Sequence, residues 1–119
     1  KLTGGLLSKM GATEGMTTVG RWMSQAEYKA MQSTGTMMEG AGGQTFVSTG
    51  GPSAFTAAAK GSVYAEFQVS SNSLLQGGQA SWFKTIGPNA GKAMQSALEK
   101  QGGQVLPKIE NLSNILQVK

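Results

Sequence analysis

Arg21 is the residue in this sequence whose type points most directly to a chemistry. It is the one arginine among ten cations, and the other nine are lysines spread along the chain. A guanidinium is a planar fork of donors that grips a phosphate or a carboxylate in a fixed geometry, which the point charge of lysine cannot copy. Arg21 also stands beside Trp22 in a segment that favours a strand. We therefore interpret Arg21 as a ligand anchor rather than an ordinary surface cation.

Four further residues offer polar groups that could accompany Arg21. Ser48 and Thr49, with Gly50 after them, close an expected strand just before an expected helix. Such a pair often caps a helix, but its hydroxyl can also support a ligand cleft or bond the ligand. Glu66 and Gln79 are rival candidates for a third site position. Glu66 is one of six acids, and Gln79 follows two glycines that allow a ligand to approach the backbone closely.

The residues that are missing exclude most other catalytic sites. The chain has no histidine, cysteine or aspartate, so a Ser-His-Asp triad, a Cys-His pair and a Cys/His zinc site cannot be built. The glycine-rich stretches 40–43 and 77–78 match neither a Walker loop nor a dinucleotide-binding Gly-x-Gly-x-x-Gly. An enzyme with this inventory is limited to reactions in which the substrate carries its own leaving group and the protein positions it and stabilises charge.

Length and charge indicate one small domain. The chain has 119 residues and a formal net charge of +4, which suits a single core and a mildly positive surface. The lysines form no cluster and arginine is nearly absent, so we expect no DNA binding. No apolar run reaches membrane-spanning length. We expect residues 1–16 to be the flexible remnant of a linker and residues 17–119 to form the domain.

The pattern of apolar and turn residues predicts an α+β fold with a curved, largely antiparallel β core and small flanking helices. Ser24 and Glu27 form a predicted capping box, in which Glu27 also reaches back to the start of the helix, and Gly35 ends that helix. We expect Ala26, Ala30 and Met31 on its buried side. Strands are predicted at 17–23, 36–39, 44–48 with Phe46 inward, 62–69 and 79–86, and helices at 24–33, 54–60, 90–101 and from about Pro107 onward.

Several of these segments, taken in order, resemble a known family of toxin domains. They are Gly20-Arg21-Trp22-Met23-Ser24-Gln25-Ala26-Glu27-Tyr28, Gly35, Phe46-Val47-Ser48-Thr49-Gly50, Val63-Tyr64-Ala65-Glu66-Phe67-Gln68-Val69 and Ile86-Gly87-Pro88-Asn89. Over residues 20–116 the chain is similar to the TreTu family of ADP-ribosyltransferases, found as C-terminal toxin domains of RHS-type polymorphic toxins. The resemblance implies a compact ADP-ribosyltransferase fold.

The resemblance also implies site residues and NAD as the co-substrate, with no metal. Arg21 matches the first-strand arginine that grips the dinucleotide. Ser48 matches the serine of a Ser-Thr-Ser-like motif, in which Gly50 here replaces the third residue. The family also has a catalytic glutamate on a late strand, in a Glu-x-Glu or Gln-x-Glu motif that the late strands of this sequence do not have. Gln79 and Glu66 are the two candidates for this third catalytic position. The residues expected to bind NAD beside Arg21 are Trp22, Thr49, Gly50, Tyr64 and Trp82, with Tyr64 or Trp82 stacking on nicotinamide.

As a function, the resemblance implies an antibacterial toxin that transfers ADP-ribose from NAD to a translation component, with elongation factor Tu as target. Ribosomal RNA as the acceptor, an NAD glycohydrolase and a non-catalytic interaction domain of a secreted protein are the alternatives. A cognate immunity protein is the expected partner. The toxin is expected to be a secreted effector, of the kind that type VI secretion delivers into the cytoplasm of a competing bacterium.

Overall fold

The computed structural model describes residues 15–119, so the expected linker remnant lies, apart from its last two positions, outside the described residues. Met16 already belongs to the first strand. The described elements are, in chain order, β1 (Met16–Met23), α2 (Gln25–Thr34), β2 (Gln44–Ser48), β3 (Val63–Ser70), β4 (Leu75–Gln76), β5 (Trp82–Ile86), α3 (Lys92–Lys100), β6 (Ile109–Glu110) and β7 (Gln117–Val118). Short 3₁₀ turns occupy Ala41–Gly43, Pro52–Ala54 and Ser71–Ser73.

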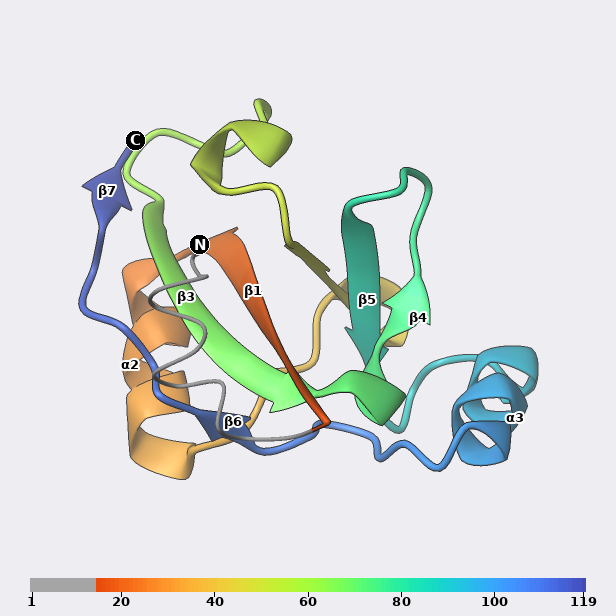
Figure 1. Cartoon of the computed structure of the whole chain (residues 1–119). Helices are drawn as coiled ribbons and strands as arrows, with labels where there is room; N and C mark the ends of the chain where they lie inside the picture. Colours follow the sequence, from red (N-terminus) through yellow and green to blue (C-terminus); the bar gives the residue numbers. More distant parts are fainter. Residues whose placement is uncertain (1–14) are drawn as a thin grey trace.

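The strands form one sheet in the order β4-β5-β2-β1-β3-β6, and β7 also pairs with β3. All the pairings are antiparallel. Figure 1 shows α2 against the β1–β3 half of this sheet and α3 at the far end, beyond β5. The expected α+β class with an antiparallel core is confirmed.

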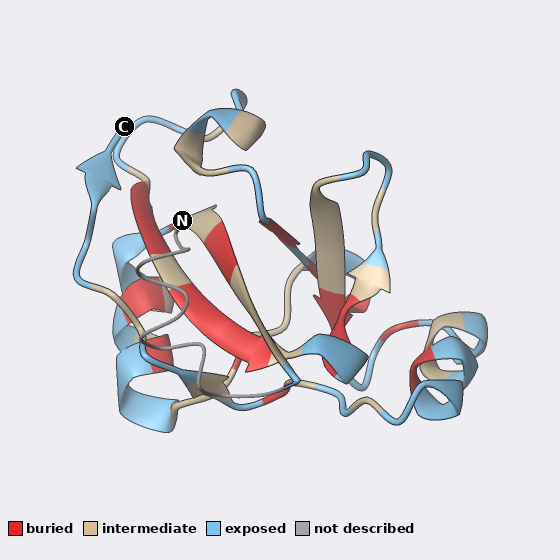
Figure 2. Cartoon of the chain, in the orientation of Figure 1, coloured by how far each residue is buried: buried red, intermediate tan, exposed pale blue. Residues whose placement is uncertain are grey.

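β3 is the centre of the core because both of its faces are covered. It pairs with β1 over eight positions, from Met16 opposite Ser70 to Met23 opposite Val63. Residues on one face, such as Phe67, pack with Met31 of α2, and both side chains are fully buried. The other face carries Tyr64 and Gln68, which are also buried. Figure 2 shows this burial as a nearly continuous red band along β3.

The helix α2 follows the expected start and stop signals. The Ser24 hydroxyl accepts a hydrogen bond from the Glu27 amide at 3.0 Å, and Gly35 ends the helix with a φ of 71°. The second half of the predicted capping box is wrong, because the Glu27 carboxylate bonds to Arg21 instead. Of the residues expected to be buried, Met31 is enclosed and Ala26 is exposed.

Other predicted elements are wrong. The alanine-rich stretch after Pro52 forms a short 3₁₀ turn and then has no regular secondary structure, in place of the expected helix. No helix begins at Pro107; the last residues instead supply β6 and β7, which pair with the free edge of β3. The expected strand at 36–39 is a single bridge between Thr36 and Lys108. Phe46 points outward with 39% of its surface exposed, because its neighbours Thr45 and Val47 occupy the buried face.

Candidate functional site

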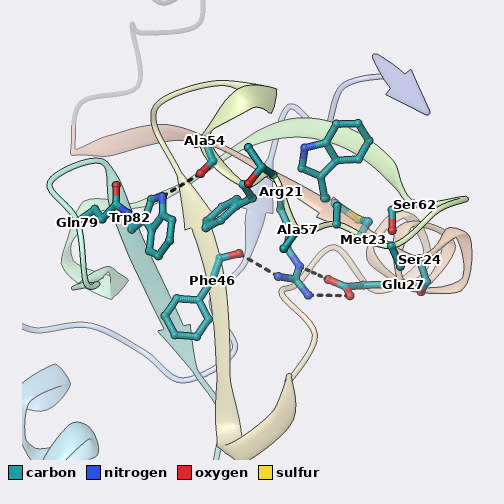
Figure 3. Close-up of a pocket in the computed structure, with 15 residues that line it drawn as sticks. Arg21, Met23, Ser24, Glu27, Phe46, Ala54, Ala57, Ser62, Gln79 and Trp82 are labelled. Atoms are coloured by element: carbon teal, nitrogen blue, oxygen red, sulfur yellow. Dashed lines mark hydrogen bonds and ion pairs between the residues drawn. The ribbon is translucent and has the colours of Figure 1, made fainter. Parts of the chain in front are cut away.

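A pocket of about 620 Å³ opens where β1 and β2 separate. These strands pair where Gly20 lies opposite Ser48, whereas β1 continues beside β3 to its end at Met23. The pocket occupies the region beyond that pair, with Arg21 in its wall (Figure 3). Its lining comes from β1, the start of α2, β2, the stretch that follows the Pro52 turn and the β4–β5 turn: Arg21, Trp22, Met23, Ser24, Glu27, Phe46, Ala54, Phe55, Thr56, Ala57, Ala58, Ala59, Ser62, Gln79 and Trp82.

The guanidinium of Arg21 is held on two sides. Its Nε donates to Oε2 of Glu27 at 2.6 Å and its Nη2 donates to Oε1 at 3.0 Å, which makes a bidentate ion pair. Its Nη1 donates to the backbone oxygen of Phe46 at 2.9 Å. Arg21 thus bridges β1 and β2 where their own ladder has ended. The side chains of Arg21 and Glu27 are 20% and 18% exposed, so the pair is partly shielded yet reachable from the pocket.

Glu27 is a pocket residue that the sequence does not identify as a candidate site residue, and it is the charged one among those missed; Phe46 and Phe55 are the aromatic ones. It occupies the third position of α2, three residues after the Ser24 cap. A glutamate at this position is typical of a capping box, so the sequence gives no reason to assign it to a ligand site. The turn between β1 and α2 is short, because Ser24 directly follows Met23. That short turn brings the first turn of α2 back beside the end of β1. The one arginine stands six residues before this acid in the sequence, but that spacing predicts a pair only when the tight turn between β1 and α2 is known.

Four aromatic side chains line the pocket, and none of them is fully buried: Trp22, Phe46, Phe55 and Trp82. Phe55 packs against Trp82 with ring centroids 4.9 Å apart. The indole N–H of Trp82 donates to the Ala54 carbonyl at 3.3 Å, and that of Trp22 donates to the Pro52 carbonyl at 2.7 Å. Both tryptophans therefore tether the stretch that begins at Pro52, which forms the upper wall in Figure 3.

Gln79 lines the pocket, but its expected position at the start of a strand is wrong. It lies in the turn between β4 and β5, and the next strand begins three residues later at Trp82. Its backbone oxygen accepts from the side-chain amide of Gln76 at 2.7 Å and from the Trp82 amide at 3.0 Å. The turn is thereby fixed, and Gln79 faces the opposite end of the pocket from Glu27 (Figure 3).

Ser48, Thr49 and Gly50 border the site without lining the pocket. Ser48 is 2% exposed, and its hydroxyl accepts from the Gly50 amide at 2.8 Å. Thr49 is exposed, and its amide donates to the Ser81 carbonyl. The hydroxyl of Ser48 therefore shapes the turn that leads from β2 to the pocket wall. This contact is of the supporting kind expected for Ser48.

Tyr64 and Glu66 lie on the other face of the sheet from Arg21. Arg21 pairs with Ala65, and side chains alternate along a strand, so the neighbours of Ala65 point away from the α2 side. The Tyr64 hydroxyl donates to Oε2 of Glu66 at 2.8 Å. Burial raises the pKa of the Tyr64 phenol well above its usual value, and the bond and negative charge of Glu66 add to this effect. Tyr64 contacts the pocket indirectly, through Trp22 at a ring distance of 5.4 Å.

The described residues limit what the site can hold. Within residues 15–119 no three His, Cys, Asp or Glu side chains gather in a way that could hold a metal ion. The helices of this part of the chain are all too short and too polar to cross a bilayer. The pocket instead combines a charged pair with aromatic walls, which suits an organic ligand that carries both a ring and a polar or anionic group.

The family model for the C-terminal domain of the TreTu toxin matches residues 16–116 of this sequence. The chain belongs to this family. The match includes every residue that lines the pocket, so the pocket is part of the TreTu toxin domain itself. A comparison with curated proteins found no match. The expected family is confirmed, and the domain is a toxin domain.

Proposed function

We propose that this TreTu domain is an antibacterial ADP-ribosyltransferase that uses NAD to modify a translation component, with elongation factor Tu as its target. The observation that carries the proposal is the position of the chain's one arginine in an aromatic-lined pocket of about 620 Å³. Arginine suits the diphosphate of NAD because its donors match phosphate oxygens. Indole and phenyl rings suit the flat nicotinamide and adenine rings. Pockets of this volume are typical of small-molecule sites.

The chemistry fits the residue inventory because NAD supplies the leaving group. The bond between nicotinamide and the ribose C1′ breaks, and its electron pair leaves with nicotinamide. The acceptor then forms a bond to C1′ and loses a proton to a carboxylate or to water. The protein has to hold the diphosphate, enclose nicotinamide and stabilise the positive charge that develops on the ribose. Arg21 is the proposed anchor, and Trp82 with Phe55 is the proposed aromatic wall.

The pocket favours some of the expected site residues over others. Arg21, Trp22, Gln79 and Trp82 share it and are retained in the proposal as ligand-contacting residues. Ser48 keeps a supporting role through its bond to Gly50. Gln79 offers an amide that can orient a ribose hydroxyl by hydrogen bonding but is a poor proton acceptor.

Incubation of the purified domain with labelled NAD and a bacterial lysate, and in parallel with purified elongation factor Tu, tests the proposal. Label on the elongation factor supports it. Label on ribosomal RNA would change the acceptor, and release of nicotinamide without labelled macromolecules would instead indicate an NAD glycohydrolase. If NAD is not consumed at all, the enzyme hypothesis fails and an interaction domain remains. Co-expression with a candidate immunity protein should suppress the labelling.

A further inference from the structure

We infer that Glu27 is a positioning residue of the pocket, which holds one edge of the Arg21 guanidinium and leaves the remaining donors for the anionic group of the ligand. This inference rests on the proposed function, because the ligand is taken to be NAD. It assigns a role to an acid other than Glu66, and a role beyond the capping of a helix, which is all that the sequence predicts for Glu27.

The charges in the pocket point to this pair. Among the residues 15–119 that line the pocket, Arg21 and Glu27 are the two that carry a formal charge. Glu66 lies outside the lining and accepts from the buried Tyr64 hydroxyl. Any effect of a carboxylate on a ligand in this pocket is therefore expected to come from Glu27 rather than from Glu66.

The hydrogen bonds of Arg21 define how Glu27 acts. A guanidinium has five N–H donors. Glu27 takes the Nε donor and one of the two on Nη2, and the Phe46 carbonyl takes one of the two on Nη1. Two N–H groups, one on each terminal nitrogen, are left over. A ligand phosphate can therefore bind to these N–H groups without displacing Glu27, and the guanidinium that carries them is already fixed in orientation.

The fixed orientation has a chemical consequence. A free arginine side chain can follow a phosphate into several positions, whereas a guanidinium held by Glu27 and by β2 places the diphosphate at one point relative to the Trp82 wall. The loss of such positioning lowers the rate of the chemical step more than it lowers affinity. Removal of Glu27 also removes a negative charge beside the diphosphate, which offsets part of the lost binding.

The one arginine makes the test direct, because its Nε–Hε group gives a single, self-assigned signal in a ¹⁵N-edited NMR spectrum of the full chain. In the free protein this signal should be shifted and protected from solvent exchange, and Glu27→Gln should abolish both features. On addition of ADP-ribose the signal should stay protected. A signal that loses its protection on addition of ADP-ribose would show that the ligand displaces Glu27 and would overturn the inference.

Kinetics supply the second arm of the experiment. Glu27→Gln should lower kcat for NAD consumption about 10- to 100-fold with less than about a threefold change in the Kd for NAD, as followed by the fluorescence of Trp22 and Trp82. Glu99→Gln is the matched control, because Glu99 is exposed on α3. If the wild-type chain neither binds nor consumes NAD, the proposed function fails. If the wild-type chain is active and Glu27→Gln behaves like Glu99→Gln, only the inference about Glu27 fails.

Discussion

The guanidinium of Arg21 and the carboxylate of Glu27 meet edge to edge in the wall of the pocket, with Nε of Arg21 2.6 Å from Oε2 of Glu27. This pair joins the end of β1 to the first turn of α2, and the additional bond from Arg21 to the Phe46 carbonyl joins both to β2. Three elements thus meet at one side chain. The candidate site lies where β1 and β2 separate, and there Arg21 links the two strands in place of their backbone hydrogen bonds.

Arg21→Lys should lower NAD turnover about 100-fold, because lysine keeps the charge but cannot bond Glu27, Phe46 and a phosphate in one plane. The free energy of unfolding should change by less than about 1 kcal/mol, since the ion pair is partly exposed and lysine can still pair with Glu27. Turnover and thermal unfolding measured on the same preparation check both parts. Lys29→Arg on the exposed side of α2 is the matched control. Full activity of Arg21→Lys would remove Arg21 from the site.

Ser48→Ala tests whether the Ser48 hydroxyl only stabilises the turn after β2 or also takes part in NAD turnover. It removes the acceptor for the Gly50 amide and should cost about 1 kcal/mol of stability. Because Ser48 does not line the pocket, turnover should fall much less than it does for Arg21→Lys. Urea unfolding and initial rates of NAD consumption give the two quantities. A loss of turnover as large as that of Arg21→Lys, in a variant of normal stability, would show that the Ser48 hydroxyl contacts the ligand.

Gly20→Ala should destabilise the domain by about 1–3 kcal/mol, the usual range for overpacking. A Cβ at this position would stand 2.0 Å from the Tyr64 hydroxyl oxygen and 2.5 Å from the ring carbon that bears it, so the buried ring would have to move. Gly78→Ala is the control, since a Cβ there meets nothing within 4 Å. Thermal unfolding of both variants gives the comparison. Equal stability of the two would contradict the placement of Tyr64 over β1.

The raised pKa of Tyr64 predicts that the free energy of unfolding decreases at alkaline pH. Its pKa is raised in the folded state by burial and by Glu66, whereas in the unfolded chain it stays near 10.0. The unfolded state therefore releases its proton first, so stability is fully present below that pH and falls as the pH rises further. The slope contributed by one such group approaches about 1.4 kcal/mol per pH unit. Urea unfolding between pH 9 and 11, about one unit on either side of the ordinary tyrosine value, measures it.

Tyr64→Phe is the control for this pH dependence. It removes the titrating hydroxyl, so its stability should decline less steeply with pH than that of the wild type, although its stability at neutral pH is lower because the bond to Glu66 is lost. Identical slopes for the two proteins would show that the Tyr64 phenol titrates normally.

The parts of the fold that the sequence predicts are those set by local rules. Ser24 and Gly35 mark the ends of α2, and the alternation from Val63 to Val69 marks β3, because caps and strand periodicity depend on near neighbours. The predicted helix at 54–60 is wrong because contacts with residues far away in the sequence decide the conformation of this stretch. An alanine run of this length forms only a marginal helix on its own, and bonds from two distant indoles fix the chain around Pro52 and Ala54.

Arg21, the anchor of the candidate site, could be predicted from the sequence, but several other residues of the pocket could not. Arg21 could be identified by its rarity, and Trp22, Trp82 and Gln79 also reach the pocket. The partnership with Glu27 depends on how tightly the chain turns between β1 and α2, which the residue types alone do not reveal. Glu66, the rival candidate to Gln79, is one of only six acids in the sequence, but the pleat of β3 turns its side chain away from the pocket.

Trp82→Phe tests whether the indole tether holds the pocket wall. The substitution keeps a ring against Phe55 and removes the N–H that bonds the Ala54 carbonyl at 3.3 Å. Stability should fall by no more than about 1.5 kcal/mol, the usual contribution of one hydrogen bond. The wall should loosen more than the rest of the domain, so trypsin should cleave faster after the exposed Lys60, which follows the wall, and the Kd for NAD should rise. Cleavage after Lys100 in α3 serves as the internal reference. Parallel acceleration at both sites would indicate general destabilisation, and the tether would then have no special role in shaping the pocket.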